Sequence, residues 1–208
     1  MKTLIFGYGI TGKAVETFFK VKSKEYLIYD DNENVILDIK KELLFDDSQM
    51  DLIDEIVISP GINPSHKQIK NFETKKIITD IDLFSREFHG KFIGVTGTNG
   101  KTTFVNLLTD FLISKGINAV ACGNVGVSPL SINFEDKDFA IVELSSFQLY
   151  YASDVIADFG IFLNFHSDHL DWHKDEKEYK KSKLKLLTFL NSDENLVTGF
   201  NTFSEKAL

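Results

Sequence analysis

The chain has 208 residues, of which 43% are hydrophobic and 26% charged, the composition of an ordinary soluble globular protein. Its net charge is -8 without a basic stripe, which argues against nucleic acid and anionic membrane as partners. Cys122 is the only cysteine, so an internal disulfide and a thiolate metal cluster are excluded. No apolar run approaches the ~20 residues of a membrane span, and the N-terminal one is too short for a signal peptide. We therefore expect a cytoplasmic protein.

The first part of the chain alternates strand and helix patterns. Strands are predicted over 2–7, 25–29, 54–59 and 75–79, with a helix after the first strand and another over 80–88. The turn from Gly7 to Gly12 (GYGITG) fits G-x-G-x-x-G, and Asp30 ends the second strand. This is the dinucleotide-binding fingerprint, and taken alone it suggests NAD with Asp30 on a ribose hydroxyl. The turn suits any phosphate or ribose, so the nucleotide stays open.

A second turn, Ser59-Pro60-Gly61, follows the strand over 54–59, at the edge where open α/β sheets bind ligands. Near residues 88–91 one series of strands and helices ends and another begins. We therefore expect an α/β protein with two domains and mainly parallel sheets. A Rossmann-like domain is predicted over residues 1–89 and a P-loop domain that binds a nucleoside triphosphate over residues 90–208.

The run Lys91–Thr103, KFIGVTGTNGKTT, is the most informative stretch of the chain. An apolar strand leads into a glycine-rich turn, and a helix with periodic apolar residues follows. We interpret the segment from Gly94 as a phosphate loop of the type G-x-x-x-x-G-K-[ST]. Glycines let backbone N–H groups surround phosphate oxygens, the lysine adds charge, and the threonine hydroxyl holds Mg²⁺. The residues predicted to bind the triphosphate are Gly97, Thr98, Asn99, Gly100, Lys101, Thr102 and Thr103.

Two strands predicted downstream, over 117–122 and 139–142, end in polar residues. The second closes on Glu143, where phosphate-loop enzymes place the carboxylate that holds Mg²⁺ or its waters. Glutamate stands there instead of the usual aspartate, and the alternative is an acid in solvent at a strand end. A further strand over 159–165 leads to His169 and His173, which are four apart and would share a helix face. A zinc site is conceivable, but we favour a loop that contributes a single ligand.

A helix is predicted over 174–190, and its apolar stripe contains a lysine. At 100° per residue, Lys183 falls near the centre of a stripe formed by Tyr179, Leu186, Leu187 and Leu190. A lysine in such a stripe usually snorkels to solvent, and the pattern alone favours that arrangement. If the side chain is buried instead, the pKa of its ammonium falls and a neutral amine becomes available. The 19 phenylalanines of the chain fall in periodic segments and are interpreted as core residues.

With these pieces assembled, the chain resembles the Mur ligases. The matching segments follow one another in family order along nearly the whole chain. They are the GYGITG turn, Ser59-Pro60-Gly61, the loop over 94–103, Gly123-Asn124-Val125-Gly126, the run ELSSFQL over 143–149, Leu163-Asn164, Asp168-His169-Leu170-Asp171, and Tyr179 with Lys183-Leu184.

The resemblance implies roles for individual residues. The first domain binds the UDP part of a nucleotide-sugar substrate rather than NAD, and Lys101 helps to hold ATP. Two Mg²⁺ ions are implied, the second of them supported by a carbamylated Lys183. The implied sets are Ile10, Thr11 and Asp30 near the uridine; Gly61, Asn124, Ser145, Gln148 and His169 near the rest of that substrate; Thr102, Glu143, His169 and Lys183 as metal-site residues; and Lys101, His169 and Lys183 as catalytic residues.

The run over 143–149 points, within the family, to the ligase that joins D-glutamate to UDP-N-acetylmuramoyl-L-alanine in peptidoglycan precursor synthesis. The implied reaction is ATP-dependent amide formation through an acyl phosphate. Mur ligases also carry a C-terminal domain that binds the amino acid. The resemblance therefore implies that this chain holds an incomplete central ATPase domain, and we expect these residues alone not to complete the ligation.

Three alternatives remain at this point. The chain could come from another Mur-type ligase that joins a different amino acid. It could be an NAD-dependent oxidoreductase built on the Gly7–Gly12 turn, or a nucleotide-binding fragment without catalysis that pairs with another chain. For the favoured function we expect a monomer.

Overall fold

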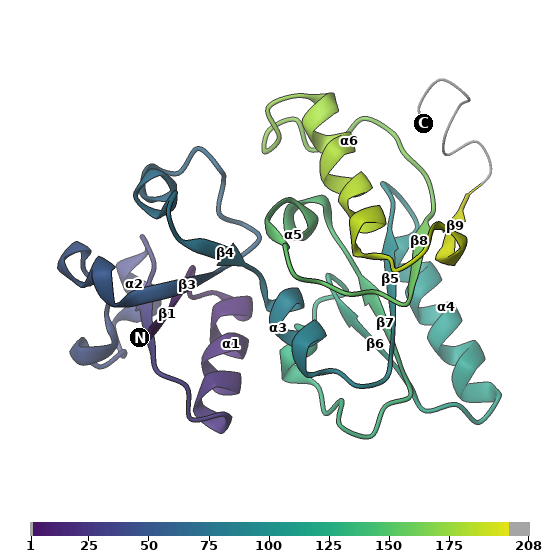
Figure 1. The fold of residues 1–208 in the computed structure, drawn as a ribbon, viewed down its shortest axis with the longest axis horizontal. Coiled ribbons are helices and arrows are strands. Elements are labelled where there is room, and N and C mark those ends of the chain that lie inside the picture. The colour runs from purple at the N-terminus through teal and green to yellow at the C-terminus, as the bar shows by residue number, and fades with distance from the viewer. Residues whose placement is uncertain (1, 200–208) are drawn as a thin grey trace.

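The computed structural model describes residues 2–199, which form two parallel β-sheets side by side (Figure 1). The first sheet has the strand order β2-β1-β3-β4, and every pair of neighbours is parallel. Its central strands read as continuous apolar runs because helices and turns cover both faces. Its elements are β1 (Lys2–Phe6), α1 (Ile10–Val21), β2 (Tyr26–Tyr29), α2 (Glu33–Ile36), β3 (Ile53–Ile58) and β4 (Lys76–Ile78), with 3₁₀ turns at Lys41–Leu43, Asp47–Leu52 and Lys67–Phe72.

The second sheet has the order β6-β7-β5-β8-β9 and is also parallel. Strand β5 lies at its centre, between β7 and β8. From β5 the chain first builds the sheet on one side, with β6 and β7, and then on the other side, with β8 and β9, so the strand order reverses beside β5. Such a switch point opens a crevice at the carboxyl ends of the strands. The elements are β5 (Lys91–Thr96), α4 (Lys101–Ser114), β6 (Ala119–Gly123), β7 (Phe139–Glu143), α5 (Ser146–Tyr151), β8 (Phe159–Phe162), α6 (Glu176–Leu184) and β9 (Leu196–Thr198), with 3₁₀ turns at Pro129–Ser131, Lys185–Phe189 and Asp193–Asn195.

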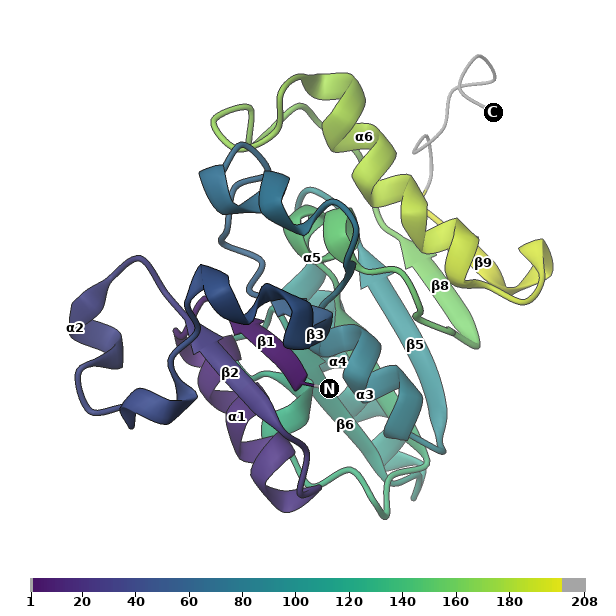
Figure 2. The ribbon, with the colours of Figure 1, turned by 60° about the vertical axis from the view of Figure 1, so that its left-hand side comes forward.

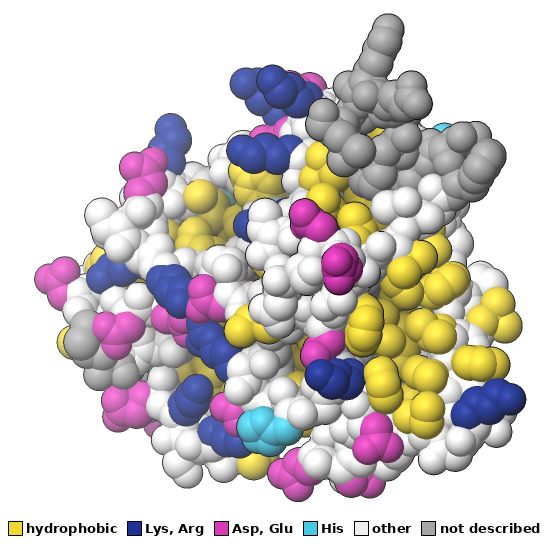
Figure 3. All heavy atoms as spheres, turned by 45° about the vertical axis from the view of Figure 1, so that its right-hand side comes forward, with side chains coloured by type: hydrophobic (Ala, Val, Ile, Leu, Met, Phe, Trp, Pro, Cys, Tyr) yellow, Lys and Arg dark blue, Asp and Glu magenta, His cyan; other side chains and the backbone are white. Residues whose placement is uncertain are grey.

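Helices cover the second sheet unequally. Helix α4 packs on one face, against β5, β6 and β7, whereas α5 and α6 pack against each other on the other side (Figures 1 and 2). Apolar side chains remain exposed on and beside α4, where they form a visible patch (Figure 3). Leu107 is 64% exposed, Phe111 55% and Phe159 41%. The interpretation of the phenylalanines as core residues is therefore wrong for Phe111 and Phe159. The face of α4 turned away from the sheet has no described element over it.

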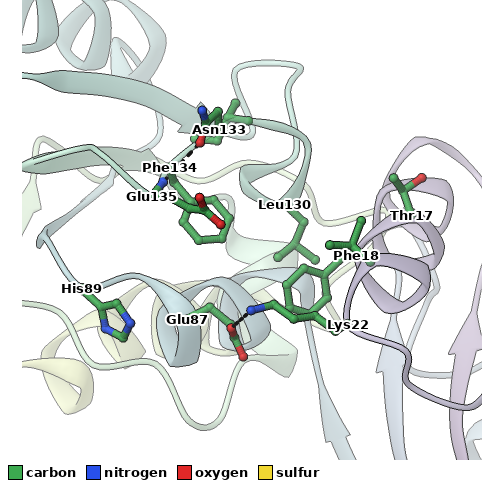
Figure 4. Close-up of a pocket in the computed structure, with 11 residues that line it drawn as sticks. Thr17, Phe18, Lys22, Glu87, His89, Leu130, Asn133, Phe134 and Glu135 are labelled. Carbon is green, nitrogen blue, oxygen red and sulfur yellow. Dashed lines mark hydrogen bonds and ion pairs between the residues drawn. The ribbon is translucent and has the colours of Figure 1, made fainter.

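Helix α3 (Asp80–Glu87) connects the two sheets. The buried carboxylate of Asp82 accepts hydrogen bonds from the backbone N–H groups of Ser153 and Asp154, which follow α5, at 2.7 and 2.6 Å. At the end of the same helix, Glu87 pairs at 2.5 Å with Lys22, the residue after α1, and both line a crevice together with Phe18, Leu130 and Phe134 (Figure 4). The predicted domain boundary lies in the connection from α3 to β5.

Most predicted elements are present, with shifted ends. The strand predicted over 159–165 ends at Phe162, and the helix predicted over 174–190 begins at Glu176 and continues after Leu184 as a 3₁₀ turn. Helix α5 and strand β9 had no counterpart in the sequence prediction. Among the described residues, no helix is long and apolar enough to cross a membrane.

Candidate active site

The predicted phosphate loop connects β5 to α4. Gly97 has φ +155° and Gly100 has φ +81°, and the second of these conformations is left-handed and favours glycine. Gly100 caps α4, so the N–H groups of the first helical turn, from Lys101 onward, have no partner within the helix and face the end of the sheet. The Lys101 side chain folds back and donates to the Thr98 carbonyl at 3.0 Å.

The interpretation of Gly94 as part of the loop motif is wrong. Gly94 stands six positions before Gly100, one more than the motif has, and lies within strand β5. A Cβ atom at Gly94 would come within 2.8 Å of a methyl group of Leu186 and 3.0 Å of one of Leu144. This glycine therefore serves the close packing of the segment after α6 on the central strand, and the loop glycines are Gly97 and Gly100.

Glu143 lies at the end of β7, directly beside the loop. Its side chain is almost fully buried, with 2% of the residue exposed, so the alternative of an acid in solvent is wrong. The Thr102 hydroxyl donates to one carboxylate oxygen at 2.7 Å, and the Asn124 side-chain amide donates to the other at 2.9 Å. The structure thus brings three predicted site residues, from the start of α4, the turn after β6 and the end of β7, into one hydrogen-bonded group.

This group fits a Mg²⁺ ion. A carboxylate and a hydroxyl supply the oxygen ligands that Mg²⁺ prefers, and Mg²⁺ usually keeps several waters and binds substrate phosphates as its other ligands. Over residues 2–199 no cluster of three or more His, Cys, Asp or Glu side chains is arranged to hold a metal ion. A metal bound here would therefore depend on phosphate oxygens for much of its coordination.

Lys183 of α6 is buried beneath the phosphate loop. Only 1% of the residue is exposed, which corrects the expectation from the pattern that it snorkels to solvent. Its Nζ donates to the Gly97 carbonyl at 2.7 Å and lies 4.8 Å from the centre of the Tyr179 ring. Burial, followed by the positive charge of Lys101, lowers the pKa of Lys183 to about 7, whereas Asp168 and Glu143 act in the opposite direction.

His169 and His173, considered above as a metal pair, have different surroundings. His169 has φ +53° and a partly exposed ring that packs on Phe147 and Tyr179, with ring centres 4.9 and 5.9 Å away. His173 is buried, and its Nε2 lies 3.0 Å from the Ser146 hydroxyl. Burial lowers the pKa of His173. Within residues 2–199 the two rings are not part of a group of three or more His, Cys, Asp or Glu side chains that could hold a metal ion.

Two further predicted substrate residues, Ser145 and Gln148, belong to the start of α5. The Ser145 hydroxyl accepts from the Gln148 N–H at 3.2 Å, and the Gln148 side-chain oxygen accepts from the Ser145 N–H at 3.0 Å. This reciprocal pair is a capping box, which stabilises a helix N-terminus. Both residues are buried, so any substrate role adds to this structural one.

The residues predicted near the uridine lie on the first sheet, away from the phosphate loop. Asp30 accepts from the N–H groups of Tyr8 and Asn32 at 2.6 and 2.8 Å and so fixes the glycine turn after β1. Ile10, at the start of α1, is 77% exposed, and Thr11 follows it, partly buried. The side chain of Ile10 is therefore open to solvent on this side of the turn.

The turn at Gly61 links the two sheets at the carboxyl ends of their strands. The Tyr151 hydroxyl donates to the Ile62 carbonyl at 2.9 Å, and the Asn63 side chain donates to the Trp172 carbonyl at 3.2 Å. Gly61 therefore lies beside the loop that carries His169. A substrate extending from the glycine turn of the first sheet towards the phosphate loop would pass this junction.

One residue had a place in the sequence motifs but no predicted role. The side chain of Asn164, just after β8, makes three hydrogen bonds to the backbone of Thr98 and Asn99 in the phosphate loop. Its position after a strand and its place in the Leu163-Asn164 segment were the signals in the sequence. Neither signal names its partners, which are 65 and 66 positions away.

The parallel sheet, the glycine loop after its central strand and the lysine and threonine at the start of α4 define a phosphate-loop α/β protein. Comparison with protein families narrows this class. The model of the Mur ligase middle domain matches residues 95–204, more than half of the chain. The chain belongs to the Mur ligase family.

Individual relatives agree with this assignment. The chain is 38% identical over 195 residues to a UDP-N-acetylmuramoylalanine–D-glutamate ligase of Francisella philomiragia, covering 90% of this chain and 44% of the relative. It is 35% identical over 201 residues to the ligase of that name from Protochlamydia amoebophila, covering 89% and 45%. The chain thus spans about half the length of these curated relatives.

A solved structure supports the fold. UDP-N-acetylmuramate:L-alanyl-gamma-D-glutamyl-meso-diaminopimelate ligase from Neisseria meningitides superposes with a TM-score of 0.57 over 96% of this chain and 71% of that one. The sequence identity is 18%, so this likeness concerns the fold alone.

Proposed function

We propose that this chain is part of an enzyme that joins D-glutamate to UDP-N-acetylmuramoyl-L-alanine at the expense of ATP, in the synthesis of peptidoglycan precursors in the cytoplasm. The observation that carries the proposal is the contact of Thr102 with the buried Glu143 at the end of the phosphate loop. The names of the curated relatives, at 35 to 38% identity, favour D-glutamate over another amino acid.

In this proposal residues 90–208 bind ATP. The N–H groups at the start of α4 and the Lys101 ammonium hold the phosphates. To do so, the Lys101 ammonium gives up its hydrogen bond to the Thr98 carbonyl and donates to a phosphate oxygen instead. Thr102 and Glu143 hold Mg²⁺, which neutralises charge on the γ-phosphate when it is bound. The alanine carboxylate of the UDP substrate attacks that phosphate, which gives an acyl phosphate and ADP. The amine of D-glutamate then attacks the acyl carbon, and phosphate leaves.

Lys183 and His169 would support a second Mg²⁺ ion. With a pKa of about 7, the Lys183 amine is neutral in a large fraction of molecules at neutral pH, which is the form that reacts with CO₂. Addition forms an N–C bond, releases one proton and leaves an anionic carbamate beside the loop. His169, whose ring packs against the Tyr179 ring, would supply an imidazole nitrogen as a further ligand.

Residues 1–89 bind the UDP part of the substrate in this proposal. The turn at Ile10 and Thr11 faces the uridine, and Asp30 orders that turn. The remainder of the substrate runs past Gly61 to Asn124, Ser145, Gln148 and His169. The Tyr151 and Asn63 contacts support this path because they hold the Gly61 turn next to the loop of His169.

Binding and turnover test the proposal separately. Calorimetry on the 208-residue chain should show binding of Mg·ATP and of UDP-N-acetylmuramoyl-L-alanine, and no tight binding of NADH. The longest polypeptide that the gene encodes should release ADP with D-glutamate as acceptor, and far more slowly with L-lysine or meso-diaminopimelate. Tight NADH binding without a response to UDP would overturn the proposal, and ADP release with a different amino acid would reassign the enzyme within the family.

A further inference from the structure

We propose that Asn164 is a positioning residue that holds the tip of the phosphate loop in its nucleotide-binding shape before any nucleotide arrives. The inference rests on the proposed function only in naming the ligand of the loop. It assigns a task to a residue just after β8, the strand next to β5, that touches neither the phosphates nor the metal in the scheme above.

The contacts of Asn164 are unusually complete for one side chain. Its Oδ1 accepts from the backbone N–H groups of Thr98 at 3.1 Å and Asn99 at 2.9 Å, and its Nδ2 donates to the Asn99 carbonyl at 3.0 Å. The Asn164 carbonyl also accepts from the Thr98 N–H at 3.1 Å. Asn164 alone therefore provides hydrogen-bond partners for the N–H groups of Thr98 and Asn99 and for the Asn99 carbonyl.

Position in the sheet explains why a side chain is needed here. Strand β8 pairs with β5 up to Phe162 opposite Thr96, and beyond that point the loop turns away from the ladder. Backbone groups that leave a ladder take other partners, from side chains or from water, and a loop is ordered where a side chain supplies them. A primary amide offers an acceptor and a donor at one end, so Asn164 replaces the missing strand.

Residues after β8 and residues of α6 make further contacts with the loop. The Thr98 hydroxyl accepts from the His166 N–H at 3.0 Å and lies 3.1 Å from the Tyr179 hydroxyl, while Lys183 holds the Gly97 carbonyl from below. The N–H groups of Thr98 and Asn99 are thus turned towards β8, and those at the start of α4 remain for phosphate. A loop fixed in this way loses little conformational freedom when a nucleotide binds.

Hydrogen exchange on the nucleotide-free 208-residue chain tests the positioning directly. In Asn164→Ala we expect the Thr98 and Asn99 amides to exchange at least about tenfold faster than in the wild type, while amides of β7 keep their protection. Asn164→Asp retains both accepting contacts and should keep most of the protection of these two amides. The matched control is Asn133→Ala, an exposed asparagine beside the crevice of Figure 4. Unchanged protection in Asn164→Ala would overturn the inference.

Binding of Mg·ADP, measured by calorimetry, tests the consequence. We expect Asn164→Ala to bind about 10- to 100-fold more weakly than the wild type and Asn133→Ala to bind equally well. Faster loop exchange with unchanged ADP affinity would also refute the inference, because the loop shape that Asn164 holds would then not be the shape on which nucleotide binding depends. If the wild type itself binds no nucleotide, the proposed function fails, and the exchange measurement still decides whether Asn164 orders the loop. Should Asn164→Ala not fold, Asn164→Asp carries the exchange measurement: its loop amides should stay protected because both accepting contacts remain, and loss of that protection would contradict the assignment of these contacts.

Discussion

The side-chain nitrogen of Lys183 lies 2.7 Å from the carbonyl oxygen of Gly97, so α6 is tied to the phosphate loop through a buried lysine. A buried ammonium loses hydration, and one hydrogen bond to a carbonyl compensates only part of that loss. The lowered pKa of Lys183 expresses this cost. Burial thus favours the neutral, nucleophilic form of the Lys183 amine, at a position where the same nitrogen contacts the phosphate loop.

Replacing Lys183 by methionine should change how stability depends on pH. The pKa of Lys183 falls from its usual 10.5 to about 7 in the folded protein, so between these values the unfolded chain binds more protons and stability rises with pH. From pH 7 to pH 9 the wild type should gain about 2 kcal/mol relative to Lys183→Met. Urea unfolding at both pH values measures this difference.

The control for this prediction is Lys181→Met, on the exposed side of the same helix. Its unfolding free energy should follow the wild type at both pH values, because an exposed ammonium keeps its hydration. Equal pH dependence in Lys183→Met and the wild type would mean that Lys183 is charged and hydrated in the folded protein, contrary to its burial.

Glu143→Gln should weaken the binding of Mg·ATP by about tenfold or more, since it removes the negative charge next to the Thr102 hydroxyl. Glutamine has the same size and can keep hydrogen bonds to Thr102 and Asn124, so the chain should stay folded. In the presence of EDTA, ATP should bind the variant and the wild type with similar affinity. Calorimetry with and without Mg²⁺ separates these cases, and Glu135→Gln, an exposed acid far from the loop, is the control. A loss of affinity that is the same with and without Mg²⁺ would argue against a metal role.

Asp80→Asn should stabilise the protein at neutral pH. Asp80 begins α3 and is buried, one of its oxygens accepts from the Ser128 hydroxyl at 2.8 Å, and the other has no partner among the described residues. Burial, helped by the nearby charge of Asp82, raises the pKa of Asp80 to about 6. The folded state therefore binds more protons than the unfolded state between about pH 4 and 6, and the wild type loses stability as pH rises through this window.

Between pH 4 and pH 7 the stability of Asp80→Asn relative to the wild type should grow by about 2 kcal/mol. Thermal or urea unfolding at several pH values gives this number. Asp110→Asn, on the exposed side of α4, should show no such trend. A constant difference between Asp80→Asn and the wild type over this range would place the pKa of Asp80 near that of an ordinary carboxyl.

Tyr151→Phe removes the hydrogen bond to the Ile62 carbonyl that joins the Gly61 turn to α5. We expect a loss of about 1 kcal/mol in unfolding free energy and a weaker affinity for UDP-N-acetylmuramoyl-L-alanine, with unchanged affinity for Mg·ATP. Tyr150→Phe is the matched control, because the hydroxyl of Tyr150 has no hydrogen-bond partner within residues 2–199. Equal loss of affinity for both ligands in Tyr151→Phe would indicate a general defect rather than a displaced turn.

Local sequence predicted the elements around the site well. The order of strand, glycine turn and helix around Gly97–Thr103 and the acid at the end of β7 are local features, because turn glycines and apolar periodicity act within a few residues. Gly94 was wrongly included in the phosphate-loop motif on the basis of the sequence. The absence of a side chain at Gly94 lets Leu186 approach the central strand, and this is a contact between segments far apart in the chain.

The tertiary structure decided the environment of the site residues. The apolar stripe of α6 contains Lys183 whether the side chain snorkels or is buried, and only the packing of α6 under the phosphate loop buries it. In the same way Leu107 belongs to a regular apolar face of α4 yet stays exposed, since periodicity defines a face but not what covers it. Asn164 shows the same limit most clearly: its amide is complementary to the loop backbone only once β5 and β8 lie side by side. The sequence by itself therefore determined which chemical groups are available at the carboxyl ends of the strands, and the sheet decided which of them are buried, paired and held against the loop.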